Sequence, residues 1–177
     1  GPAGAGQEPD VHLGQADLPL MLAWGFTTVF NPGHDDLGSF TKSKALASHD
    51  PSRMPNFFGV GRAITIKGGH ASAPRYGTAM PETPEEGRRT VRQMKQAGAD
   101  AIKLIYDDLS QGGRPPVPIM HVDVMRSIID EAHGQRLKVY AHAPQLRHAK
   151  EVMRAGADGL VHALDVERID DELLALM

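Results

Sequence analysis

The sequence predicts an α/β fold in which helices cover a parallel sheet. Short apolar runs that are typical of buried strands alternate with amphipathic helical patterns. The runs are continuously apolar, as strands are when both faces of a parallel sheet are covered. The same four-residue connection also occurs twice. A helical pattern is connected to an apolar run by Ala97-Gly98-Ala99-Asp100 and again by Ala155-Gly156-Ala157-Asp158. Glycine stands there at the position where helices end in the left-handed conformation, which predicts the same helix-to-strand connection twice.

The predicted elements follow one another regularly. Strands are predicted over 26–30, 60–66, 101–106, 138–143 and 159–163, and helices over 18–24, 84–97, 122–133, 145–155 and 165–177. The helix over 84–97 has the clearest start, since Thr83 is a typical N-cap and Glu85 and Glu86 follow in its first turn. Residues 1–17 are predicted to be a loop or a remnant segment. The 160 residues from 18 to 177 are enough for one domain with a sizeable core.

Composition excludes several classes of function. A formal net charge of -3 argues against a nucleic-acid or membrane-surface partner. No apolar stretch approaches the ~20 residues of a membrane span, and no signal-peptide pattern opens the chain. We therefore expect a cytoplasmic protein, unless a leader once preceded Gly1. The chain has no cysteine, so a metal ion would need nitrogen and oxygen ligands.

Three of the apolar runs each contain one polar residue that suits a metal site. These residues are Lys103, His142 and His162. A buried cation or imidazole costs several kcal/mol unless a partner compensates, and a metal ion is an effective partner for an imidazole. Parallel strands place such side chains together at their carboxyl ends, most easily in a barrel. The sequence therefore predicts one convergent site.

Five blocks of the chain, in order, resemble the amidohydrolase superfamily, and in particular its imidazolonepropionase-like and prolidase-like enzymes. The blocks cover 24–29, 62–70, 99–104, 131–143 and 155–162. This resemblance implies a TIM-type (β/α)8 barrel of the metal-dependent hydrolase kind, with residues 18–177 as a partial catalytic domain that contains strands two to six. It also implies hydrolysis of a C–N bond, in an amide, peptide-like or cyclic amide substrate, by a metal-activated water.

The same resemblance implies roles for individual residues. Lys103 corresponds to the lysine that is carboxylated to bridge two divalent ions, and His142 and His162 correspond to ligands of the second ion. One or two zinc ions are the expected cofactor. His70, which follows Gly68-Gly69, corresponds to a histidine that contacts substrate, and Tyr106 is a second candidate for such a contact.

The chain also departs from the family pattern. It lacks the His-x-His pair of the first strand and the catalytic Asp of the eighth, so no catalytic proton-shuttle residue is expected in it. Asp10-Val11-His12 comes nearest to the pair, with His12 as a candidate ligand or as part of a loop. A complete barrel needs about 250 residues. We expect a truncated barrel, inactive alone, whose unpaired strand edges favour a homo-oligomer.

Other interpretations of these residues stay open at this stage. Lys103 could extend its ammonium to the barrel mouth or act as a Schiff-base nucleophile, and His142 and His162 could be hydrogen-bonded core residues. The whole chain could be a catalytically incomplete fragment with a residual metal site or an assembly role. Additional site candidates are His34, Arg75 and Arg114, whereas His49, His121 and His148 are expected on the surface and His133 at a helix end.

Overall fold

The computed structural model describes residues 17–33, 36–164 and 167–177, and it confirms the α/β class. Its helices are α1 (Asp17–Ala23), α2 (Leu37–His49), α3 (Pro84–Gln96), α4 (Val122–Gly134), α5 (Leu146–Arg154) and α6 (Asp171–Leu176). Its strands are β1 (Thr28–Asn31), β2 (Asn56–Gly59), β3 (Ala101–Ile105), β4 (Lys138–His142) and β5 (Gly159–Leu160). No helix in these ranges is long and apolar enough to cross a membrane.

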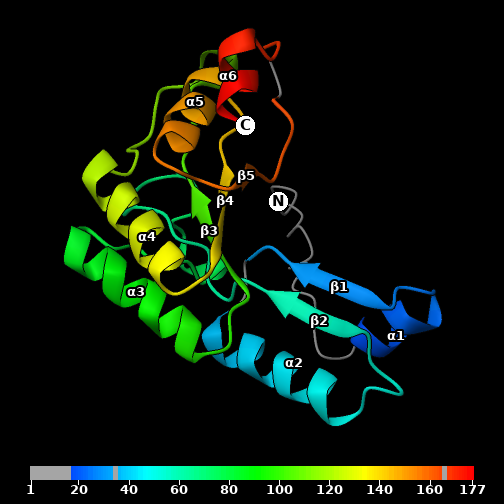
Figure 1. Cartoon of the computed structure of the whole chain (residues 1–177). Helices are drawn as coiled ribbons and strands as arrows, with labels where there is room; N and C mark the ends of the chain where they lie inside the picture. The colour runs from blue at the N-terminus through cyan, green and yellow to red at the C-terminus, as the bar shows by residue number, and fades with distance from the viewer. Residues whose placement is uncertain (1–16, 34–35, 165–166) are drawn as a thin grey trace, which may run out of the picture.

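The strands form two parallel sheets in sequential order. One sheet pairs β1 with β2, and the other has the order β3-β4-β5. The two sheets are joined where the Asp100 amide donates to the Gly59 carbonyl at 2.8 Å. The segment after β2 also pairs with β3 at Ile64, whose amide donates to the Lys103 carbonyl and whose carbonyl accepts from the Ile105 amide, both at 2.8 Å. Within the described residues the five strands therefore form two separate parallel sheets and no closed barrel (Figure 1).

The second strand lies earlier than predicted. Residues 60–66 were expected to form it, but the paired strand is Asn56–Gly59, and Ile64 makes only isolated bridges. Gly61 explains the error, because its φ of +68° is left-handed and interrupts an extended run. A Cβ on Gly59 would lie 2.9 Å from the Phe40 ring, so β2 packs closely on α2 only because of this glycine. The fifth strand is also shorter than predicted, and His162 lies beyond it.

Four helices match their predicted ranges closely, but α6 begins at Asp171 after its N-cap Asp170 and is much shorter than the helix predicted over 165–177, and one helix was not predicted. Thr83 accepts from the Glu86 amide, and Glu86 reaches back to the Thr83 amide, so α3 begins with a complete capping box. Helix α2 was not predicted, although its N-cap residue Asp36 accepts from the amides of Gly38 and Ser39. Its apolar residues do not form a clear stripe, which hides it from periodicity. Helices α3 and α4 lie side by side against β3 and β4 (Figure 1).

The core lies between the sheets and the helices. Ile102, Leu104 and Tyr106 in and after β3, with Val139 and Ala141 in β4, belong to the main apolar cluster. Buried residues of α3, α4 and α5 complete that cluster, among them Val91, Met94, Val124, Met125, Ile128, Ile129, Ala132 and Val152. Side chains alternate between the two faces of a strand. The residues of β3 and β4 that lie between these core residues therefore face the opposite, concave side of the sheet. Lys103, Ile105, Tyr140 and His142 lie on that side.

Candidate functional site

The pairing of β3 and β4 places the predicted site residues on one face. Ile105 is opposite His142, and Lys103 is opposite Tyr140. Residues opposite each other in a parallel pair point to the same side, so Lys103 and His142 lie on one surface, one side-chain repeat apart. This face carries the two predicted ligands that lie on these strands.

Lys103 is a buried cation without a counter-charge. Its side chain is 5% exposed, and in the described part of the chain its ammonium makes no hydrogen bond or ion pair. Burial lowers the pKa of Lys103 from 10.5 to about 8, because water no longer solvates the charge. A larger fraction of this amine is therefore neutral at physiological pH than of an exposed lysine.

His142 lies at the centre of a group of imidazoles. Its ring is in edge-to-face contact with those of His70 and His162, with both centroid distances at 4.7 Å. Burial lowers the pKa of His142 to about 4, although the neighbouring Asp107 carboxylate acts to raise it. The neutral imidazole that results is the form that binds metal ions. His162 lies just past β5 and its side chain is exposed.

Asp107 is the site residue that sequence reasoning missed. It is buried, and its Oδ2 lies 3.0 Å from His70 Nδ1 and 3.2 Å from His142 Nε2. Burial acts to raise the pKa of Asp107, but hydrogen bonds from the Leu109 amide and His142 outweigh it and hold the pKa below its usual value. A signal was present, because Asp107 follows Lys103 and Ile105 at two-residue spacing and so belongs to the same face.

The loop after β3 is also tied to the start of α5. Asp108 accepts from Gln145 Nε2 at 2.8 Å and from Arg147 Nη2 at 2.5 Å, and Ser110 donates to it as well. These bonds hold the pKa of Asp108 far below its usual value against the effect of burial. The network fixes the backbone beside Asp107.

Two predictions about single residues need correction or reassignment. His148 was expected on the surface, but it is buried in α5 with its ring against that of Tyr106, because it lies on the face of α5 that packs into the core. Tyr106 donates to Glu151 at 2.7 Å, and burial together with this carboxylate raises its pKa. Since Tyr106 lies with the core residues on the helix-covered side, we assign it to packing.

The remaining candidates fall into three groups. His12 and His34 lie outside the described residues. Arg75 stacks on Tyr76 with 4.6 Å between its guanidinium carbon and the ring centroid, and both Arg75 and Arg114 are exposed. His133 lies at the end of α4, as expected, and bonds to Asp158 at 2.9 Å.

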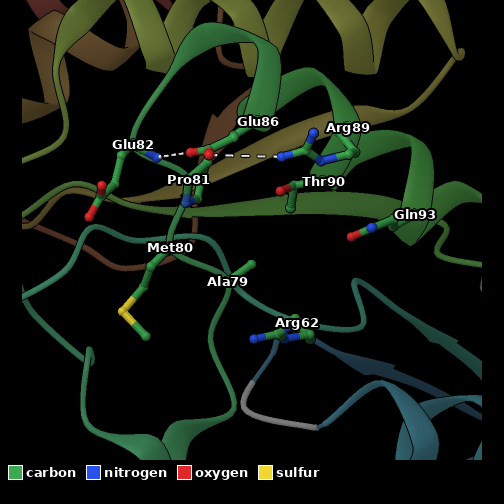
Figure 2. Close-up of a pocket in the computed structure, with 9 residues that line it drawn as sticks. All are labelled: Arg62, Ala79, Met80, Pro81, Glu82, Glu86, Arg89, Thr90 and Gln93. Atoms are coloured by element: carbon green, nitrogen blue, oxygen red, sulfur yellow. Dashed lines mark hydrogen bonds and ion pairs between the residues drawn. The ribbon is translucent and has the colours of Figure 1, made fainter.

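One open pocket of about 330 Å³ lies between the start of α3 and the segment that precedes it. Figure 2 shows that Glu86 faces both the Glu82 amide and Arg89 there. Arg62 reaches the carbonyls of Gly77 and Thr78, so its guanidinium ties the walls together. None of the predicted site residues lines this pocket, and Arg89 and Glu86 in its lining form an ion pair.

The donor set on the concave face fits a divalent ion. Two imidazoles in contact, one of them kept neutral by burial, are nitrogen ligands suited to zinc and related metals. A buried lysine without a partner suits conversion to an anionic oxygen ligand, since a carbamate removes the unpaired cation.

Solved structures resemble this chain, although no protein-family model and no curated protein matches it. An amidohydrolase structure has 29% sequence identity and a TM-score of 0.68, and covers 91% of this chain. An Xaa-Pro dipeptidase with methionine in its active site has 25% identity and a TM-score of 0.69, and covers 86%. An ochratoxinase from A. niger, at 21% identity and a TM-score of 0.75, shows the fold alone and covers 92%. The chain spans 42%, 40% and 42% of their lengths, respectively.

Proposed function

Because the chain shares its fold with members of the amidohydrolase superfamily, as its sequence blocks predict, we propose that it is part of a metal-dependent hydrolase that cleaves a C–N bond. We also propose that its strands are the second to the sixth of a (β/α)8 barrel. The sequential parallel order from β1 to β5 supports this, as does the junction at Ile64.

The observation that carries the proposal is the buried, unpartnered Lys103 on the same face as His142. An amine with a lowered pKa reacts with carbon dioxide: its nitrogen forms a bond to carbon and releases a proton, and an anionic carbamate results. Lys103 in this form, His142 and His162 would hold one or two divalent ions, with zinc as the expected metal. A bound ion of this kind polarises a carbonyl and lowers the pKa of water.

His70 is the residue proposed to meet the substrate. Its Nδ1 is held by Asp107, so Nε2 is the ring nitrogen that remains to accept from a donor group of the substrate, such as an amide N–H. A small amide or dipeptide-like substrate is proposed, since two of the structural neighbours are named as an Xaa-Pro dipeptidase and as a prolidase in complex with N-methylphosphonate-L-proline. His12 is proposed as an additional ligand from the sequence alone.

Metal content tests this proposal directly. The purified chain is incubated with Zn²⁺ and ¹³C-bicarbonate, desalted and analysed for zinc and for a ¹³C carbamate resonance. We expect bound zinc that falls by at least tenfold in His142→Ala and His162→Ala and a carbamate resonance that is lost in Lys103→Ala. His49→Ala, a substitution of an exposed histidine at the end of α2, is the matched control and should retain both.

Activity is measured separately with Xaa-Pro dipeptides and N-acyl amino acids. The chain alone is expected to be inactive, and the longer protein that supplies the remaining strands is expected to be active. Absence of zinc and carbamate from the wild-type chain would favour an incomplete barrel fragment with an assembly role.

A further inference from the structure

Asp107 sits at a point where every neighbour is a hydrogen-bond donor. Its Oδ2 faces the ring nitrogens of His70 and His142. Its Oδ1 accepts from the Leu109 amide at 3.0 Å and from Gln145 Nε2 at 3.3 Å. The side chain is 1% exposed, so water does not replace a lost partner easily. The position therefore requires a group that only accepts, which is an ionised carboxylate.

This arrangement determines which ring nitrogens carry protons. A nitrogen that lies 3.0–3.2 Å from a carboxylate oxygen must donate to it. His70 is therefore protonated at Nδ1, and His142 is protonated at Nε2. When each ring is neutral, the lone pair is on Nε2 in His70 and on Nδ1 in His142. One carboxylate thus imposes opposite tautomers on two adjacent histidines.

We propose that Asp107 is a positioning residue that orients the metal-binding and the substrate-binding imidazole together. It would leave Nδ1 of His142 free to hold a metal ion and Nε2 of His70 free to accept from a donor group of the substrate. The assignment of tautomers follows from the contacts of Asp107, and only the use of those nitrogens rests on the proposed function. Carboxylates that hold the second nitrogen of a ligating histidine commonly contribute 10–100-fold to metal affinity.

Asparagine cannot reproduce this arrangement. An asparagine side chain has one acceptor oxygen and one donor nitrogen. If its oxygen faces the two imidazoles, its amide nitrogen faces the Leu109 amide and Gln145, which are also donors. If it is turned the other way, the imidazoles face a donor and must change tautomer or move. Asp107→Asn therefore either removes hydrogen bonds or forces a change of tautomer, while conserving shape.

The experiment is histidine-ring ¹H–¹⁵N NMR on the full 177-residue chain, stripped of metal and held at pH 8. Ring signals are assigned with His70→Gln and His142→Gln. We expect the Nδ1–H tautomer for His70 and the Nε2–H tautomer for His142 in the wild type. In Asp107→Asn at least one of these should change, whereas Asp130→Asn, which alters an exposed carboxylate of α4, should leave both unchanged. The opposite tautomer at either wild-type histidine would overturn the proposal, and this holds even if Asp107→Asn fails to fold.

A zinc titration against a competing chelator gives the second readout. Asp107→Asn should bind Zn²⁺ 10–100-fold more weakly than the wild type, and Asp130→Asn should bind within about threefold of it. Unchanged affinity in a folded Asp107→Asn variant would contradict the positioning role. If the wild type shows the expected tautomers but binds no zinc, the proposed metal-dependent function fails while the orientation of the two rings by Asp107 stands.

Discussion

At the scale of single residues, the concave face concentrates groups that are costly to bury unless they serve a site. Lys103 is a buried cation without a partner in the described residues, and His142 is a partly buried imidazole beside two others. Asp107 supplies the one buried carboxylate that contacts His70 and His142. A structural core would replace such groups with apolar ones of similar volume, which is often stabilising.

Lys103→Met should therefore stabilise the metal-free protein. Below pH 8 the buried lysine is charged in both the folded and the unfolded state, and burial imposes its full cost. Between pH 8 and 10.5 only the unfolded state holds the proton, so the stability of the wild type rises with pH. The advantage of the variant should be up to ~3 kcal/mol at pH 7 and should shrink toward pH 10.

Urea unfolding of both proteins in EDTA and carbonate-free buffer measures this difference. Other groups titrate equally in the two proteins, so the difference between them reports Lys103 alone. A difference that stays constant from pH 7 to pH 10 would show that Lys103 does not have a lowered pKa.

At the scale of elements, the repeated Ala-Gly-Ala-Asp joint works in the same way at both positions. Gly98 and Gly156 have φ values of +89° and +102°, and the next residue in each case donates back to the last turn of its helix. Asp100 then accepts from the Gly59 amide, and Asp158 accepts from the Val139 amide, both at 2.8 Å. Each aspartate thus ties the start of its own strand to a neighbouring strand.

Substitutions of glycine by alanine should have opposite effects inside and after a helix. Gly98→Ala should destabilise the protein by ~1–2 kcal/mol, because its left-handed φ is costly for any residue with a Cβ. Gly134→Ala should stabilise it by ~1 kcal/mol, since Gly134 is the last residue of α4 and a Cβ there meets nothing within 4 Å. Thermal unfolding of the two variants tests this contrast, and the same sign for both would contradict the assigned helix end.

The connection that follows α4 provides a further test, at Arg136. It follows α4 with a φ of +59°, in the place where the other two joints have glycine. Arg136→Gly should relieve this strain and raise the free energy of unfolding by ~0.5–1 kcal/mol. Arg136→Ala, which keeps the Cβ, is the matched control and should give little of that gain.

At the scale of the whole molecule, the described residues leave aromatic side chains and strand edges uncovered. Phe26, Phe30 and Phe58 are exposed in and around β1 and β2, and Trp24 at the end of α1 is 71% exposed. In this part of the chain β1 pairs only with β2, and β5 pairs only with β4. Such edges and apolar surfaces favour association with another strand or another copy.

The chain is therefore predicted to self-associate through this surface. Sedimentation equilibrium should show a mass that rises with concentration, and the emission of Trp24, the single tryptophan, should shift to the blue as the mass rises. Phe26→Lys should weaken association by at least tenfold, whereas Leu174→Lys, at an equally exposed position of α6, should not. A monomer across the whole concentration range would contradict the prediction.

The sequence by itself determined the class of the fold, the order of most elements and the face that carries Lys103 and His142. These features depend on local periodicity and on helix-end chemistry, which residues close in sequence encode. Tertiary structure alone decided the position of β2, since Gly61 and the packing of Gly59 on Phe40 set it. It also revealed Asp107, whose role depends on donors brought from three separate segments, and the burial of His148, which depends on how α5 packs.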